Sequence, residues 1–502
     1  MIGARFARVT PDVDVSFARA LHVLADFWPY FTGALGIACA SLATAHIVLH
    51  KRDVRAAIGW TGLAWLAPIA GPLLYLFLGV NRIRRRAASL RGRPGASEGF
   101  TSEHMLARQE LAVLPPDLPS RLAAIARVVG TSTGQPLVGG NVVEPLVDGD
   151  EAYPAMVAAI DAATRTVGLA TYIMDNDRAG HLVADALERA VARGVDVRVL
   201  VDDVGIRYSR PPIVRTFPKR GIPVARFNPA IVPFAHPYFN LRNHRKLLVV
   251  DGCIGFAGGM NIRENCLLAL KPSHPTRDLH FRVEGPVVRQ FVETFAFDWQ
   301  FTTREALAGD GWFPPLVPRG HVVARGIPDG PDEDLNTLQD ALAGALSQAD
   351  HSVRIVTPYF LPDDRLVEAL RIASLRGVRV DILLPAHGNL RVVEWAMMGQ
   401  LTEVLGSGCR VWFGPLPFDH TKLMLVDGAW SLFGSANWDP RSLRLNFEFC
   451  VECYDQPLAV RLGALLDQRF SVARRYHLAE HQARGLPRRL RDGVARLALP
   501  YL

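Results

Sequence analysis

HRKLLVVDGCIGFAGGMN at residues 244–261 and HTKLMLVDGAWSLFGSAN at residues 420–437 are two copies of one pattern. Both follow H-x-K-x(4)-D-x(6)-G-[GS]-x-N, so each supplies the same side chains at the same spacing. One short H-x-K-x(4)-D match arises easily by chance, whereas two copies that share the longer extension do not. The repeated block therefore predicts that the chain is built from a duplicated unit.

The sequence before each block repeats as well. In the first half, residues 165–177, 181–194 and 195–203 predict a strand, an amphipathic helix and a strand. Residues 351–364, 365–377 and 378–385 give the same order in the second half. Such β-α-β units predict two α/β lobes. We place them at residues 119–318 and 319–473, with the boundary near GWFPPLVPRG, before the strand that begins HVVARG.

The repeated side chains suit the chemistry of a phosphodiester. On an extended strand a histidine and a lysine two residues apart project from one face, so each copy presents an imidazole beside an ammonium. Ammonium and amide groups stabilise the charged oxygens of a phosphodiester without a metal. One imidazole can attack phosphorus while the other protonates the leaving alkoxide and then takes a proton from the incoming alcohol. The predicted catalytic set is His244, Lys246, Asp251, His420, Lys422 and Asp427.

Within that set, we interpret Asp251 and Asp427 as structural residues. Each lies five positions beyond its lysine, on the opposite side of a continuous strand, and precedes a glycine at a turn. A nucleophilic histidine works best when a carboxylate holds its other ring nitrogen. Asp278 and Glu448 follow the two blocks and are the candidates, although Asp278 also fits a surface acid. The alternative for the whole set is a pair of core histidines without chemistry.

Two long uncharged segments precede the lobes. Residues 27–49 and 56–80 contain no Asp, Glu, Lys or Arg, and each exceeds the about 20 residues that cross a bilayer as a helix. They predict a transmembrane hairpin over residues 27–80, preceded by a segment of residues 1–26 whose zero net charge disfavours a secretory signal. Pro68, Gly71 and Pro72 leave open a kinked or re-entrant second segment.

The positive charge of the chain is local. The net charge is +7, yet residues 82–93 contain six arginines and no acid. We assign residues 81–118 to a basic juxtamembrane linker and residues 474–502 to a basic tail. The excess of arginine after the second segment predicts that the body is cytoplasmic. The tail suits either anionic headgroups or a solvated terminal helix.

The cysteines and one histidine pair do not predict a metal site. Six cysteines are too few for a disulfide framework in 502 residues. Cys450 and Cys453 fall on a predicted strand and face opposite sides, so they cannot share a metal. HLAEH at residues 477–481 resembles a zinc pattern but lacks a third ligand, and we expect this helix on the surface. No metal or cofactor is therefore expected.

Together the two blocks resemble the phospholipase D superfamily. WLAPIAGPLLYLFLGVNRIRRR, NHRKLLVVDG, TPYFLPDD and GSANWDPRSLRLNFE make the chain similar to bacterial cardiolipin synthases over about residues 30–470. The resemblance implies an α/β fold of two phospholipase D-like lobes, each a mixed sheet flanked by helices. It also implies pseudo-twofold symmetry with the active site at the interface, and attachment to the cell inner membrane by several passes.

The resemblance implies a reaction too. The phosphatidyl group of one phosphatidylglycerol passes through a phosphohistidine to the glycerol hydroxyl of another, and glycerol is released. Under this resemblance His244 is the nucleophile and His420 the general acid and base. The groups expected at the phosphate are Lys246, Lys422, Asn261, Asn437, Gly259 and Ser435, while Asp278 and Glu448 orient the histidines.

Two other functions remain open at this point. A hydrolase of the same superfamily, acting on lipid or nucleic acid, would use water in place of the lipid alcohol. A catalytically inactive lipid-binding scaffold is the third possibility. The hydrophobic segments favour an anionic phospholipid in a membrane as the partner, and the lack of an aromatic and basic stripe disfavours nucleic acid. The oligomeric state and the preferred acceptor are left open.

Overall fold

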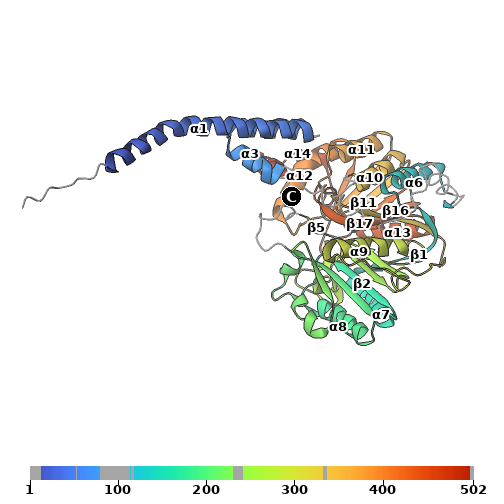
Figure 1. Ribbon diagram of the computed structural model, residues 1–502. Helices are drawn as coiled ribbons and strands as arrows, with labels where there is room; N and C mark the ends of the chain where they lie inside the picture. The colour runs from blue at the N-terminus through green and yellow to red at the C-terminus, as the bar shows by residue number, and fades with distance from the viewer. Residues whose placement is uncertain are drawn as a thin grey trace, which may run out of the picture. The chain divides into compact units, whose positions relative to one another are not determined.

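The computed structural model describes residues 13–51, 54–79, 113–114, 118–229, 241–331 and 336–497 (Figure 1). The chain divides into two compact units, Met1–Arg82 with Phe234–Pro237, and Ile83–Pro233 with Tyr238–Leu502. The arginine cluster of residues 82–93 lies outside the described residues. The larger of the two units is called the body.

The N-terminal unit contains one long helix and a broken one. α1 covers Val13–His50, and its part Phe27–His50 is long and apolar enough to cross a membrane. The second segment forms α2 over Val54–Leu66, α3 over Ala70–Leu74 and a π-helical turn over Tyr75–Gly79. Pro68 has no amide hydrogen, and its ring clashes with the preceding turn. The second segment is therefore broken near Pro68, in agreement with the kinked or re-entrant alternative that the sequence leaves open.

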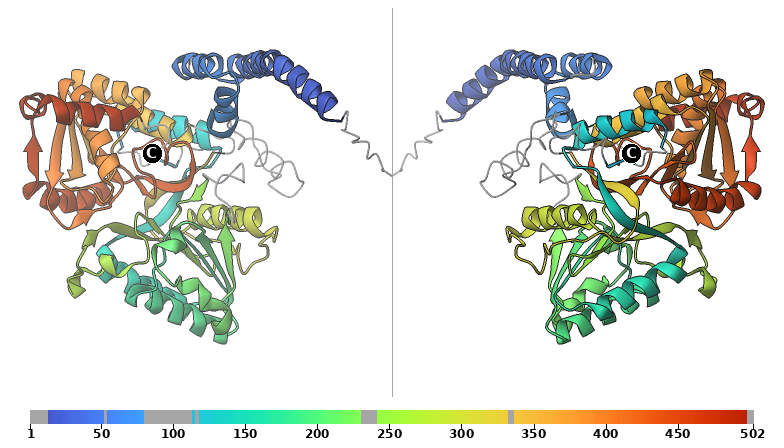
Figure 2. Two further views of the ribbon diagram at one scale, coloured as in Figure 1. Left: turned by 90° about the vertical axis from the view of Figure 1, so that its left-hand side faces the viewer. Right: turned by 90° about the vertical axis from the view of Figure 1, so that its right-hand side faces the viewer.

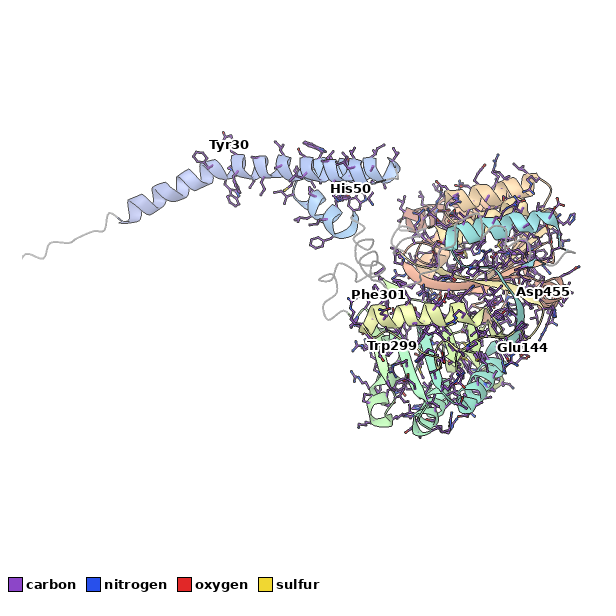
Figure 3. All side chains as sticks on the ribbon, turned by 45° about the vertical axis from the view of Figure 1, so that its right-hand side comes forward. Tyr30, His50, Glu144, Trp299, Phe301 and Asp455 are labelled. Carbon is purple, nitrogen blue, oxygen red and sulfur yellow. The ribbon has the colours of Figure 1, made fainter. Side chains whose placement is uncertain are left out.

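The two segments of this unit pack against each other. His46 Nδ1 lies 2.8 Å from the Tyr75 hydroxyl, and Trp65 Nε1 donates to Thr44 Oγ1 at 3.1 Å. Ile47 and Tyr75 belong to a small buried apolar cluster. Elsewhere on α1 large side chains face outward, such as Tyr30 at 79% exposure (Figure 3). A helix that leaves such side chains exposed is suited to lipid surroundings.

The body is built on one 16-stranded mixed sheet that runs through both halves. In the first half its order is β1-β9-β7-β6-β2-β3-β4, and in the second β10-β17-β16-β15-β11-β12-β13-β18. Each strand of the first half has a counterpart at the same place in the second. The two halves join where β1 pairs antiparallel with β10. The strand order is therefore the same in both halves, as the duplication predicted from the sequence requires.

The strands of the two halves have the following bounds. Those of the first half are β1 Val138–Val147, β2 Thr166–Thr171, β3 Asp196–Asp202, β4 Val224–Phe227, β6 Leu247–Val250, β7 Ile254–Gly258 and β9 Leu279–Glu284. Those of the second are β10 Val322–Asp329, β11 Ser352–Val356, β12 Arg379–Pro385, β13 Arg410–Gly414, β15 Leu423–Val426, β16 Trp430–Gly434, β17 Asn446–Tyr454 and β18 Arg474–Tyr476.

Helices cover both faces of the sheet (Figures 1 and 2). The first half contains α6 Ser120–Thr133, α7 Asp148–Ala162, α8 Arg178–Ala192 and α9 Val288–Thr303. The second contains α10 Thr337–Gln348, α11 Asp364–Leu375, α12 Arg391–Gly406, α13 Gln456–Ser471, α14 Leu478–Gln482 and α15 Leu486–Leu497. α7 and α8 bury one core, and α6, α10, α11 and α12 bury another. α9 and α13 share a third core that contains side chains from both halves.

That shared core fixes the two halves together. The rings of Phe281 and Phe433 stack with their centroids 3.6 Å apart, one from each half. Phe291 on α9 packs edge-on against Phe449 on β17. Because aromatic side chains bury large apolar areas, contacts of this kind hold the joint between the halves closed. The functional site lies at this joint.

The local sequence explains why the repeated elements form. Asp177 accepts a hydrogen bond from Gly180 N at the start of α8, and Asp363 accepts one from Leu366 N at the start of α11. Such caps satisfy amides that have no partner inside the helix. The predicted β-α-β units are confirmed, whereas the lobe boundaries stay predictions. Cys450 and Cys453 do face opposite sides of β17, since each lies in a different core.

Candidate active site

A short strand precedes each histidine and pairs with a strand of the opposite half. β5, Arg242–Asn243, pairs in parallel with the start of β17, and β14, Phe418–Asp419, pairs in parallel with β8, Thr276–Arg277. The next residues continue the exchange, because His244 N donates to Phe447 O at 2.9 Å and His420 N donates to Arg277 O at 2.8 Å. The first of these bonds places His244 beside Glu448, the residue after Phe447. The second places His420 beside Asp278, the residue after Arg277.

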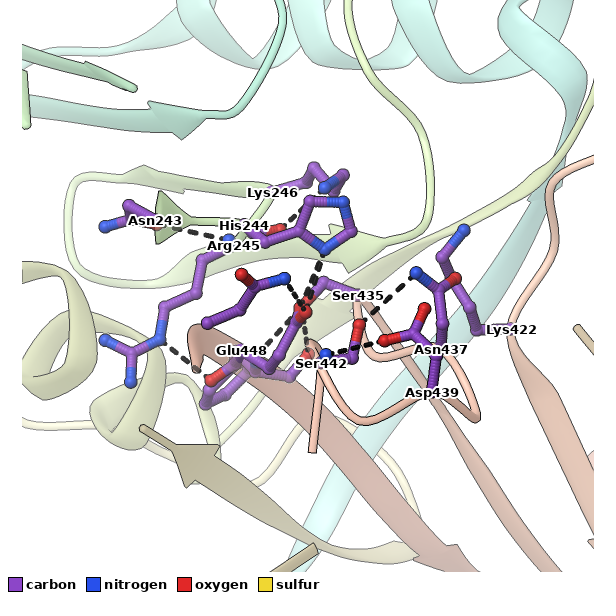
Figure 4. A network of polar contacts seen from close by, with 12 residues as sticks. Asn243, His244, Arg245, Lys246, Lys422, Ser435, Asn437, Asp439, Ser442 and Glu448 are labelled. Carbon is purple, nitrogen blue, oxygen red and sulfur yellow. Dashed lines mark hydrogen bonds and ion pairs between the residues drawn. The ribbon is translucent and has the colours of Figure 1, made fainter. Parts of the chain in front are cut away.

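Each histidine is therefore held by the carboxylate of the other half. His244 Nδ1 lies 2.9 and 3.0 Å from the two oxygens of Glu448 (Figure 4). His420 Nδ1 lies 2.8 Å from Asp278 Oδ2. Both carboxylates are fully buried, so the surface-acid alternative for Asp278 is wrong. A carboxylate that accepts Nδ1–H leaves Nε2 with its lone pair.

Burial sets the charge of these pairs. It lowers the pKa of His244 and of His420 to about 4, and the nearby lysines add to the shift. Burial alone would raise the pKa of Glu448, but the interactions with His244 and Lys246 outweigh it and hold the pKa below its ordinary value. The pKa of Asp278 is likewise held below its ordinary value, although burial alone would raise it. At neutral pH the site thus contains neutral imidazoles on ionised carboxylates.

The two lysines lie against the histidines of their own copies. Lys246 Nζ donates to His244 O at 2.6 Å and lies 5.4 Å from the centre of the Tyr172 ring. Lys422 Nζ donates to His420 O at 2.5 Å and lies 3.0 and 3.1 Å from the two ring nitrogens. Burial lowers the pKa of Lys246 to about 7 and of Lys422 to about 8. An anion in the site would stabilise both ammonium groups and raise these pKa values.

Both histidines line one cavity of about 850 Å³. Asn261 and Asn437 line it too, at equivalent points of the two blocks. Asn261 Oδ1 accepts a hydrogen bond from Ile173 N, which fixes its side chain. Asn437 Oδ1 is buried and has no hydrogen-bond partner within the described part of the chain. The structure thus brings together the imidazoles and amides that the sequence predicts to meet.

Gly259 and Ser435 do not lie where the sequence analysis expects them. Both are absent from the cavity lining among the described residues. Ser435 Oγ instead donates to Glu448 Oε2 at 2.5 Å and accepts from Phe449 N at 3.0 Å. A Cβ on Gly259 would lie 2.5 Å from Asp278 Oδ1. These residues position the carboxylates behind the histidines, which differs from the predicted contact with phosphate.

Asp251 and Asp427 also lie away from the cavity lining. Asp251 accepts hydrogen bonds from the backbone amides of residues 164, 165 and 166, just before and at the start of β2. Asp427 accepts them from residues 350, 351 and 352 at the start of β11, and it pairs with Arg121. These contacts support the interpretation that both aspartates are structural residues. They do not support the inclusion of these two residues in the predicted catalytic set.

Several residues of the site are not among those predicted from the sequence. Asn446 Nδ2 donates to Glu448 Oε1 at 3.1 Å, and Arg245 Nε donates to Glu448 O at 2.8 Å. The ring of Tyr172 packs edge-on against His244. Asn446 stands two residues before Glu448, so strand alternation places both on one face and is a signal that predicts this contact. The contact of Tyr172 depends on tertiary structure, for which the sequence has no local signal.

The HLAEH segment takes part in a polar network on α14. His481 Nε2 lies 2.9 Å from Thr402 Oγ1, and Glu480 pairs with Arg474. His481 is only 2% exposed, so the expectation of a surface helix is wrong at this residue. The described residues contain no group of three or more histidine, cysteine, aspartate or glutamate side chains that could hold a metal ion.

Comparison with known proteins supplies the family. A family model described as "Cardiolipin synthase, PLD-like domain" matches residues 156–299 and 342–470, which contain both blocks. The chain belongs to the phospholipase D-like cardiolipin synthase family. A second model, described as the N-terminal part of phospholipase D-nuclease proteins, matches residues 39–79. The family match covers most of the duplicated body, and the second model covers the end of α1 together with α2 and α3.

Relatives and one solved structure agree with this family. The chain is 30% identical over 468 residues to the cardiolipin synthase of Listeria monocytogenes, covering 92% of this chain and 96% of the relative. It is 31% identical over 473 residues to the major cardiolipin synthase ClsA of Bacillus subtilis, with the same coverage. The crystal structure of the phosphatidylserine synthase of Haemophilus influenzae shares the fold, with a TM-score of 0.58, 15% identity, and coverage of 75% and 100% of the two chains.

The family sets the class of reaction. Cardiolipin synthases of this type are phosphatidyltransferases of the phospholipase D superfamily, and this chain is an enzyme of that class that acts on a phospholipid. The apolar part of α1 and the match to the N-terminal model indicate a membrane protein. The two histidine–carboxylate pairs are then the candidate catalytic groups of a phosphatidyl transfer.

Proposed function

We propose that the enzyme condenses two phosphatidylglycerol molecules to cardiolipin and glycerol through a phosphohistidine. The single observation that carries the proposal is the pair of crossed histidine–carboxylate contacts that open into one cavity. Two basic nitrogens around one site allow a reaction in two displacements, with one nitrogen as nucleophile and the other as proton carrier. A cavity that is also lined by arginine side chains suits an anionic lipid.

In the first step His244 Nε2 attacks phosphorus. The bond from phosphorus to the glycerol oxygen breaks, and His420 Nε2 donates a proton to the departing alkoxide. A phosphate anion in the cavity favours this protonated form of His420, because opposite charge raises the pKa of an imidazole. Lys246 and Lys422, with the amides of Asn261 and Asn437, stabilise the charge on the phosphoryl oxygens.

In the second step a hydroxyl of another phosphatidylglycerol approaches from the side that glycerol has left. His420 Nε2 takes the hydroxyl proton, the oxygen attacks phosphorus, and the bond from phosphorus to His244 breaks. The carboxylate of Glu448 supports the positive charge on the His244 ring while phosphorus is attached. Both histidines end in their starting protonation states, so the cycle is balanced.

We also propose a multi-pass arrangement in the inner membrane, with the body in the cytoplasm. The arginine excess after the second apolar segment supports this orientation through the positive-inside rule. The break after Leu66 is compatible with a kinked second crossing, whereas a re-entrant second segment would contradict the multi-pass arrangement. Cysteine accessibility from each side of sealed vesicles, probed at single engineered sites before α1 and after residue 80, tests the arrangement.

Purified full-length protein with phosphatidylglycerol in mixed micelles and no added metal tests the reaction. We expect cardiolipin and free glycerol in equal amounts. Phosphatidic acid as the main product would instead indicate hydrolysis, and no product over a range of detergents and salt would indicate a scaffold. His244→Ala and His420→Ala should each abolish turnover without changing the circular dichroism spectrum. Near-normal rates in either variant would refute the assigned roles.

A further inference from the structure

The C-terminal helix α15, Leu486–Leu497, packs on the body by one face only. Asp492 is fully buried and Ala495 is 7% exposed on the face that contacts α12. The helices approach closely, since a Cβ on Gly399 of α12 would lie 2.8 Å from Asp492 O. Asp492 is ion-paired with Arg484 and Arg491, which secures this face. The helix therefore has a fixed inner face and a fixed outer face.

The outer face of α15 is an apolar stripe. Leu486, Leu490, Val494 and Leu497 are 65%, 60%, 67% and 79% exposed. At 100° of rotation for each residue these four side chains fall within an arc of about 80°, opposite the buried pair. A soluble surface helix normally places its leucines inward and its polar residues outward. Here the leucine and valine side chains point outward, which marks this face as an interaction surface for an apolar partner.

Arginines border the stripe. Arg491 lies on one side of it and Arg489 and Arg496 on the other, as the helical rotation requires. Arg488 and Arg489 are exposed and form no ion pair within the described part of the chain. An apolar stripe between cationic edges is the pattern of a helix that lies in a membrane interface. Each basic residue near an anionic surface strengthens such binding.

The helix on which α15 packs leads to the active-site cavity. Arg491 on α15 stacks 4.7 Å from the ring of Trp395 on α12, and Arg496 pairs with Glu403 eight residues further along α12. α15 therefore packs along α12, which begins directly after a residue of the cavity lining. Leu390, just before α12, lines the cavity and is 52% exposed, and Leu416 lines it and is 66% exposed.

We propose that α15 docks the body on the anionic surface of a lipid bilayer, with the stripe among the acyl chains and the arginines at the headgroups. This contact is made by the body itself. The proposal rests on the proposed function, because a lipid substrate must pass from the bilayer into the cavity. Docking beside Leu390 and Leu416 would let the acyl chains stay in an apolar surrounding while the headgroup reaches His244 and His420.

Photo-crosslinking tests the contact directly. Full-length protein with p-benzoylphenylalanine in place of Leu490 is reconstituted in vesicles of phosphatidylglycerol and phosphatidylcholine. Leu375 on α11 is the matched control, since it is a leucine with 66% exposure at the end of another helix. We expect lipid adducts at position 490 at least five times more often than at position 375. Adducts mainly to protein, to a second copy of the chain, or equal yields at both positions would refute the proposal.

Activity gives the second test. Leu490→Gln keeps a good helix former while removing the apolar contact, and Leu375→Gln is its control. We expect Leu490→Gln to reduce turnover about tenfold on bilayers and to leave turnover of short-chain monomeric phosphatidylglycerol unchanged. Equal rates on bilayers, or equal losses on both substrates, would refute docking. If the wild type makes no cardiolipin from either substrate, the proposed function fails, while the crosslinks still decide the docking.

Discussion

Replacing Glu448 by Gln isolates the contribution of one carboxylate to the reaction. The side chain is fully buried, and its oxygens lie 2.9 and 3.0 Å from His244 Nδ1. A glutamine amide oxygen can accept the same hydrogen bond, so the tautomer of His244 is kept. What the substitution removes is the negative charge that faces the ring when phosphorus is attached to Nε2. The variant therefore reports mainly the electrostatic part, with Ser435 Oγ accepting from the new amide group in place of donating to the carboxylate.

The size of the effect follows from the geometry. Solvent does not screen the pair. A hydrogen bond to a charged partner contributes about 1.5–3 kcal/mol and one between neutral groups about 0.5–1.5 kcal/mol, so removing the charge while keeping the bond costs about 1–1.5 kcal/mol. A tenfold change in rate corresponds to about 1.4 kcal/mol. We therefore expect kcat/KM for phosphatidylglycerol to fall about 5- to 13-fold. The loss should appear mainly in kcat, because Glu448 does not line the cavity among the described residues and the contact strengthens as charge develops on His244.

Cardiolipin formation from radiolabelled phosphatidylglycerol measures the rate, and acid-labile label on the protein measures the intermediate. Glu448→Gln should show slower formation of labelled protein in rapid-quench experiments. Glu368→Gln on the exposed side of α11 is the control for the chemical change alone. Thermal unfolding of each variant separates a loss of activity from a loss of fold. Rates within threefold of wild type in a folded Glu448→Gln protein would refute the role of this carboxylate.

Three further substitutions test other parts of the site. Gly259→Ala should lower kcat about 10-fold or more in a folded protein, because its Cβ would displace the Asp278 carboxylate; unchanged steady-state kinetics would contradict this. Asp251→Asn should lower the free energy of unfolding by about 1–3 kcal/mol with kcat unchanged. Since hydrogen bonds hold the pKa of Asp251 below its ordinary value despite burial, the difference in denaturant melts should vanish at acid pH; a selective loss of kcat would indicate catalysis. With the pKa of Lys246 lowered to about 7 by burial, kcat/KM should fall as pH rises above that range, and Lys246→Arg should shift this fall to higher pH; coincident pH profiles would exclude Lys246 as the titrating group.

Much of the secondary structure of the body can be predicted from the local sequence. The strands of β2 and β3 and the helix of α8 follow from short patterns, as do their counterparts β11, β12 and α11. The repeated motif is likewise local, and it predicts the histidines and asparagines that line the cavity. These features depend on alternation and periodicity within about 15 residues, which is the range that a sequence pattern reports well.

The pairing across the halves is not local. His244 and Glu448 are 204 residues apart, and no pattern near either residue says which histidine a carboxylate will meet. Ser435 matches a phosphate contact by its place in the motif, but the side chain turns toward Glu448. The break after Leu66 is different, because Pro68 is a local signal of where the helix ends, whereas hydropathy measures only the apolar length of the segment.

The crossed pairing has a consequence for how the site is assembled. Each histidine depends on the backbone of the opposite half for its position and on the opposite carboxylate for its tautomer. Neither half alone contains a complete histidine–carboxylate pair, so catalytic geometry exists only when the joint between the halves is closed. The stacked rings of Phe281 and Phe433 lie in that joint. Packing in the shared core and chemistry in the cavity are therefore coupled, because loosening that joint would separate His244 from Glu448 and His420 from Asp278 together.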